Sequence, residues 1–127
     1  MLCFFGDGIM NYNKLGSTGI TVSGICFGSL AVSPLQSDFS IEEGGKIIEY
    51  AMEMGINFID TAEYYGNYPY IRHALKSSQR DLIVASKSYA YTYEGMRNSV
   101  EKARKEIDKD VIDIFMMHEQ ETSLTLK

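Results

Sequence analysis

Four short apolar segments alternate with amphipathic segments along most of this chain, and this alternation restricts the fold more than any other feature. The apolar segments begin near residues 25, 56, 82 and 111. Helical spacing of apolar residues is clearest in 40–55 and 92–109, which lie between them. Apolar strands that alternate with amphipathic helices indicate a parallel sheet covered by helices. A doubly wound sheet and a (β/α) barrel both satisfy this pattern, although the first apolar segment lacks the G-x-G-x-x-G fingerprint of dinucleotide-binding sheets.

Local signals predict where the first helix begins and ends. Ser40 followed by Glu43 is the pattern of a capping box, and Gly55 is placed to end the helix. Gly44 and Gly45 each weaken a helix by about 1 kcal/mol relative to alanine, which does not overturn the prediction.

Two further helices are expected downstream. One follows Pro69 and covers residues 70–78. The other covers residues 92–109, where Glu101 and Lys105 are spaced to attract each other one turn apart.

The beginning of the chain differs from the repeating part. Two short alternating runs flank residues 16–19, whose composition is typical of a hairpin turn. Residues 1–9 fit poorly with the hairpin pattern that begins after them, and we expect them to be a leader, a disordered start or a mis-assigned start. The remaining residues, 10–127, are enough for a single core.

Composition narrows the classes of partner and compartment. The net charge of −5 argues against a nucleic-acid partner, because phosphate binding needs a basic surface. No apolar run approaches the roughly 18 residues of a membrane helix, so no membrane partner is expected. Cys3 and Cys26 lie far apart in sequence without a neighbouring ligand residue, which favours a reduced, cytoplasmic protein.

Ionisable residues stand at the ends of three successive predicted strands. Asp60 ends the second apolar segment, Lys87 ends the third and His118 ends the fourth, while Tyr65 follows Asp60 by five residues. Carboxyl ends of parallel strands lie at one edge of a sheet, where α/β proteins build their sites. We therefore expect these side chains to meet.

Each of the four residues has an ordinary structural explanation when taken alone. Asp60 could cap a turn and Lys87 could be a solvated lysine at a strand end. His118 could be a hydrogen-bonded histidine at the sheet margin, and Tyr65 is one of nine tyrosines. Their shared place in successive repeats favours a functional site.

Such a cluster suits proton transfer to a substrate oxygen. An ammonium about 4 Å from a tyrosine favours its phenolate by roughly 4 kcal/mol at an effective dielectric near 20, as an upper figure. Asp60 can hold Lys87 by paired hydrogen bonds and keep it charged. His118, if neutral, offers a directional N–H to a substrate oxygen. The set suits a carbonyl that receives a hydride, and it includes neither a nucleophile with its own base nor a ligand set for a metal.

The motifs "FIDTAEYYG", "IVASKS" and "IDIFMMHEQE" resemble, in this order and spacing, those of the aldo-keto reductases. The resemblance assigns the catalytic tetrad of that family to Asp60, Tyr65, Lys87 and His118. "CFGSL" resembles the first barrel strand of the family, which implies that Gly28 and Ser29, together with Asp60, lie near a bound NADP or NAD. "HEQE" is similar to bacterial members of the family.

The resemblance implies that residues 10–127 are the N-terminal half of a (β/α)8 TIM barrel domain, because the chain supplies four strands where the family has eight. Tyr68 and Arg72 stand where the family usually has an acidic or amide residue and a glycine. The implied function is that of the N-terminal part of an NAD(P)H-dependent reductase of small carbonyl substrates. The alternative is a non-catalytic half-barrel that senses cofactor or binds a partner. Open sheet edges predict self-association.

Overall fold

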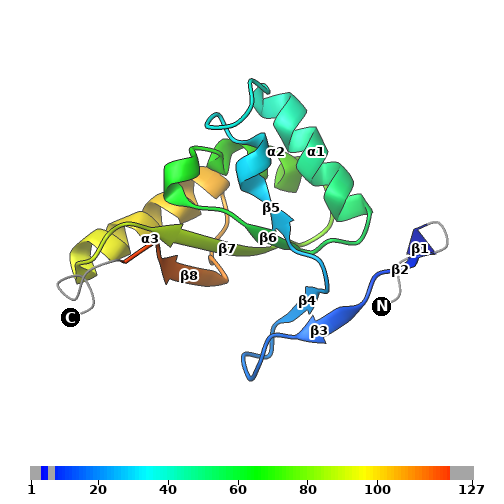
Figure 1. The fold of residues 1–127 in the computed structure, drawn as a ribbon, viewed down its shortest axis with the longest axis horizontal. Helices are drawn as coiled ribbons and strands as arrows, with labels where there is room; N and C mark the ends of the chain where they lie inside the picture. The colour runs from blue at the N-terminus through cyan, green and yellow to red at the C-terminus, as the bar shows by residue number, and fades with distance from the viewer. Residues whose placement is uncertain (1–3, 6–7, 121–127) are drawn as a thin grey trace.

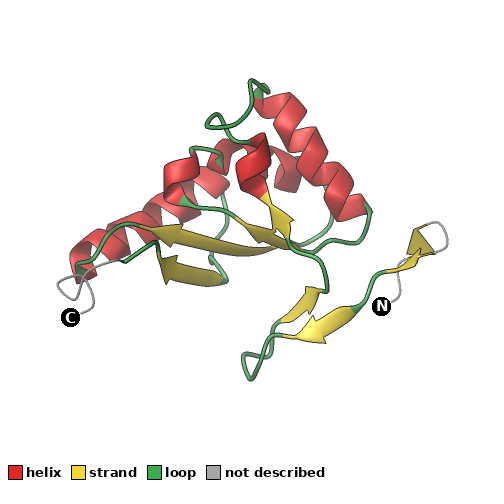
Figure 2. Cartoon of the chain, in the orientation of Figure 1, coloured by secondary structure: helices red, strands yellow, loops and turns green. Residues whose placement is uncertain are grey.

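In the computed structural model, which describes residues 4–5 and 8–120, a parallel sheet carries a layer of helices on one face (Figure 1). The sheet has the strand order β5-β6-β7-β8, so each strand pairs with the next one in the chain. Its strands are β5 (Phe27–Gly28), β6 (Phe58–Asp60), β7 (Ile83–Ser88) and β8 (Ile114–Met117). The helices are α1 (Ile41–Glu53), α2 (Tyr68–Ser77) and α3 (Tyr93–Ile107). The predicted alternation of strand and helix is confirmed (Figure 2).

The faces of the sheet follow from the alternation of side chains along each strand. Ile59 in β6 and Val84 in β7 are fully buried in the apolar core beneath the helices. Because neighbouring side chains on a strand point to opposite faces, Asp60 and Lys87 lie on the face away from the helices. The strands are shorter than the apolar segments from which they were predicted, and the first segment contributes only two residues to the sheet.

Helix α1 forms as its sequence predicts, but its two glycines have a role that the sequence does not reveal. The capping box between Ser40 and Glu43 is present in both directions. A Cβ atom at Gly44 would overlap the ring of Tyr70 in α2. A Cβ atom at Gly45 would lie 2.5 Å from the ring of His73 in α2. The glycines therefore permit the close packing of α1 on α2, and their cost to helix propensity is offset there.

Helix α2 begins earlier than predicted, at Tyr68, with Pro69 in its first turn. Proline is well tolerated there because the first N–H groups of a helix have no partner within the helix. The departure from the family pattern at Tyr68 and Arg72 is accommodated, since Tyr68 is buried and Arg72 pairs with Asp108 of the αL turn after α3 at 3.5 Å. The expected Glu101–Lys105 pair is replaced by Glu101–Arg104, three residues apart at 2.8 Å.

The predicted hairpin is confirmed in β3 (Tyr12–Lys14) and β4 (Thr21–Ser23), with positive φ at both turn glycines. It is attached to the start of β6, because the side chain of Asn57 accepts a hydrogen bond from the Ser23 N–H at 2.6 Å. In Figure 1 the hairpin lies on the side of the sheet away from the helices.

Before the hairpin, β1 (Phe4–Phe5) pairs with β2 (Gly8–Ile9). The rest of the expected leader lies outside the described residues, so that expectation remains a prediction. Among the described residues, none of the helices is long and apolar enough to cross a bilayer.

Candidate active site

The residues expected at the site lie at the end of the sheet where the carboxyl ends of its strands meet. Asp60 is the last residue of β6, Lys87 is the penultimate residue of β7 and His118 directly follows β8. Tyr65 ends the short 3-10 helix η2 (Glu63–Tyr65), which turns back over this end of the sheet after β6. The shared direction of the strands thus gathers side chains from three different strand ends, together with Tyr65 from the turn after β6.

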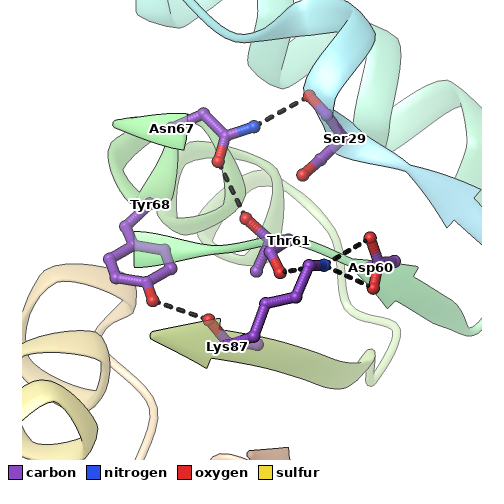
Figure 3. A network of polar contacts seen from close by, with 7 residues as sticks. Ser29, Asp60, Thr61, Asn67, Tyr68 and Lys87 are labelled. Atoms are coloured by element: carbon purple, nitrogen blue, oxygen red, sulfur yellow. Dashed lines mark hydrogen bonds and ion pairs between the residues drawn. The ribbon is translucent and has the colours of Figure 1, made fainter. Parts of the chain in front are cut away.

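Lys87 and Asp60 form a tight ion pair (Figure 3). The Lys87 ammonium lies 2.8 Å from each carboxylate oxygen of Asp60, and it donates a further hydrogen bond to the Thr61 carbonyl oxygen at 2.9 Å. The three contacts match the three N–H donors of an ammonium group. The Lys87 side chain is 14% exposed and that of Asp60 is 39% exposed, so the lysine is withdrawn from water while its partner remains reachable.

Tyr65 and His118 lie beside this ion pair. The Lys87 Nζ atom is 5.1 Å from the centroid of the Tyr65 ring, within range of a cation–π attraction. The Tyr65 ring meets the His118 ring edge to face, with centroids 6.1 Å apart. His118 is 8% exposed, and its Nδ1 atom is buried without a hydrogen-bond partner among the described residues. The structure therefore brings together all four of the predicted residues.

Tyr89 belongs to the same group and was missed in the sequence. Its ring stacks on His118, with centroids 4.3 Å apart and an angle of 18° between the planes. Its hydroxyl donates a hydrogen bond to Glu119 at 2.9 Å, and this bond raises the pKa of Tyr89. Tyr89 directly follows β7, two residues after Lys87. This position at a strand end is the only signal in the sequence that could have identified it.

A carboxylate anchors η2, the turn that carries Tyr65. Glu63 accepts hydrogen bonds from Ser88 at 2.7 Å and from Lys102 of α3 at 3.3 Å. Burial tends to raise the pKa of Glu63, but the hydrogen bonds from Ser88, Ser99 and Lys102 outweigh it and hold the pKa below its usual value. Glu63 therefore ties η2 to β7 and α3 in its ionised form.

Gly28 and Ser29, expected near a cofactor, differ in their accessibility. Gly28 is exposed, and open space lies where its side chain would be. Ser29 is fully buried at the start of the 3-10 helix η1 (Ser29–Val32), and its hydroxyl has no hydrogen-bond partner among the described residues. Gly28 and Asp60 could therefore touch a bound nicotinamide, whereas the Ser29 side chain lies beneath that surface.

A model of the aldo/keto reductase family matches residues 24–126 of the chain. L-galactose dehydrogenase of Arabidopsis thaliana is 33% identical over 120 residues, which are 84% of this chain and 37% of that protein. The probable aldo-keto reductase 1 of Glycine max is 29% identical over 130 residues, which are 90% of this chain and 38% of that protein.

A solved structure of a thermostable aldo-keto reductase in complex with the inhibitor epalrestat superposes with a TM-score of 0.75. It is 32% identical, and the match covers 86% of this chain and 43% of that one. The chain thus spans about two fifths of the length of the proteins it matches. The expected part-barrel fold is confirmed, and the chain belongs to the aldo/keto reductase family.

Proposed function

We propose that this chain carries the catalytic side chains of an NAD(P)H-dependent reductase that converts a small aldehyde or ketone to an alcohol. The observation that carries the proposal is the ion pair of Lys87 and Asp60 with Tyr65 and His118 around it. Membership of a family of oxidoreductases supports the same reaction class.

The cofactor surface within this chain would be small. Exposed Gly28 and the accessible carboxylate of Asp60 fit the nicotinamide end of NADP or NAD. A cofactor held against Gly28 and Asp60 would supply the hydride that reduces the carbonyl carbon of the substrate. Because Ser29 is buried, Gly28 and not the Ser29 side chain would contact the nicotinamide.

The tyrosine hydroxyl would protonate the substrate oxygen as negative charge develops there. Lys87 places a positive charge next to the Tyr65 ring, which favours the phenolate that remains after the proton leaves. The hydrogen bonds of Lys87 to Asp60 and Thr61 occupy its donors, so it acts on Tyr65 through its charge. His118 lies beside the Tyr65 ring, where an imidazole N–H could orient the same oxygen.

A pair of tyrosine substitutions tests the proposal. We would titrate the chain with NADPH and NADH and measure their oxidation with an aliphatic and an aromatic aldehyde. Tyr65→Phe should lose at least about 100-fold of turnover, the usual contribution of a positioned proton donor. Tyr64→Phe is the matched control, because Tyr64 lies in the same η2 turn with an exposed ring.

The other results separate the alternatives. Cofactor binding without turnover would overturn the reductase proposal and favour a cofactor-sensing module. Absence of binding by both cofactors would favour an interaction module. Equal turnover of Tyr65→Phe and Tyr64→Phe would exclude Tyr65 as the proton donor.

A further inference from the structure

Asn67 occupies the position before α2 where a helix-capping residue is expected, but its side chain makes no capping bond. An asparagine cap typically stabilises a helix by about fivefold in its folding equilibrium. Asn67 is fully buried, and its amide reaches in two other directions instead (Figure 3). The unused cap indicates that the side chain serves something other than the helix.

The two bonds of the Asn67 amide fix its orientation. Its Nδ2 atom donates to the Ser29 carbonyl oxygen at 2.8 Å, and a carbonyl oxygen can only accept. The Oδ1 atom must then face Thr61, whose hydroxyl donates to it at 2.8 Å. Both of these contacts are buried, so leaving either partner unpaired would carry the cost of a buried polar group.

All three polar groups of Thr61 form hydrogen bonds, and the third of these bonds is with Lys87. Its N–H donates to the carbonyl oxygen of Ala85 in β7 at 2.9 Å, while its hydroxyl is held by Asn67. The Thr61 carbonyl oxygen then accepts from the Lys87 ammonium at 2.9 Å. A continuous path of hydrogen bonds therefore runs from Ser29 through Asn67 and Thr61 to Lys87.

We propose that Asn67 is a positioning residue, which acts through Thr61 to hold the Lys87 ammonium in place beside Tyr65. The same amide holds the carbonyl of Ser29, so it couples the turn after β5 to the lysine. The inference rests on the proposed function only where it assigns the Lys87 charge a catalytic role beside Tyr65. The position of the ammonium can be measured without turnover.

The test uses NMR of lysine ammonium groups in the full chain. A shielded, hydrogen-bonded ammonium exchanges its protons slowly with water, so Lys87 should give an observable signal, assigned by its loss in Lys87→Arg. Lys109 is an internal reference, because it is similarly shielded at 17% exposure and pairs with Asp113 at 3.1 Å before β8, remote from Asn67 in sequence. Asn67→Ala should accelerate exchange at Lys87 by about tenfold and leave Lys109 unchanged.

A second pair of variants keeps the test independent of helix stability. Thr61→Val removes the hydroxyl while keeping the shape, and it should accelerate exchange at Lys87 as Asn67→Ala does. Thr61→Ser restores the hydroxyl and should restore slow exchange. Asn98→Ala is the control for loss of an amide, because Asn98 is exposed on α3.

Two results would overturn the inference. One is an unchanged Lys87 signal in folded Thr61→Val, which shows that Thr61 needs no anchor. The other is equal acceleration at Lys87 and Lys109, which shows general loosening of the chain. Failure of carbonyl reduction with slow Lys87 exchange intact would instead reject the proposed function alone.

Discussion

The ion pair of Asp60 and Lys87 should contribute measurably to stability as well as to chemistry, and a double-mutant cycle can isolate that contribution. The cycle comprises Asp60→Asn, Lys87→Met and the double variant, each unfolded in urea. At 2.8 Å and an effective dielectric near 20, the gross attraction is about 6 kcal/mol. Most of it is offset by desolvation of the lysine, while the exposed part of Asp60 remains screened by water. Hydrogen bonds between charged groups retain about 2 kcal/mol, which is the coupling free energy we expect.

The chain contains a control pair of the same charge type. Glu42 and Lys46 in α1 lie 2.6 Å apart, yet their side chains are 66% and 64% exposed. If burial rather than distance determines the strength of an ion pair, the cycle of Glu42→Gln and Lys46→Met should give a coupling near zero. Equal couplings for the two pairs would refute this reasoning, and so would a coupling near zero for Asp60 and Lys87.

Three further predictions concern packing, pH and assembly. Gly44→Ala should lower the free energy of unfolding by about 1 to 2 kcal/mol despite the better helix propensity of alanine, because its methyl group would overlap Tyr70; a higher midpoint of urea denaturation would contradict the packing role. The lowered pKa of Glu63 means that its stabilising contribution is present above about pH 4.5 and lost as the pH falls through the folded pKa, so Glu63→Gln should flatten the stability profile below about pH 4.5; a variant profile parallel to that of the original chain would reject this. Strands β5 and β8 each have one neighbour within the described chain, so we expect self-association in sedimentation velocity, and a stable monomer at all concentrations would exclude it.

The sheet edge that carries the site could be predicted from the sequence, because one geometric rule connects strand ends to a common place. Asp60, Lys87 and His118 were each found by that rule. The rule does not identify every partner of Lys87, however. One partner is the backbone carbonyl oxygen of Thr61, a group that every residue has. Side-chain identity cannot reveal a backbone acceptor.

The residues that were missed depend on contacts between distant elements. Asn67 looks like an ordinary helix cap in the sequence, and only the fold places Ser29 within reach of its amide. Gly44 and Gly45 look like weak points of a helix, and only the position of α2 shows that larger side chains would not fit. Helix propensity and capping preference are properties of the local sequence, whereas the roles of these residues depend on their contacts with other elements of the fold.

The matching order of the strands in the sheet and in the chain has a consequence for how this protein acquires its fold. Within this sheet β6, β7 and β8 each pair with the strand that precedes them, so these pairings of the described residues do not wait for a distant part of the sequence. A chain emerging from the ribosome could add β6, β7 and β8 one at a time to an existing edge, with each intervening helix closing over the latest addition. Assembly could therefore keep pace with translation, and the pairing of Asp60 with Lys87 would become available as soon as the third of the four strands has been synthesised.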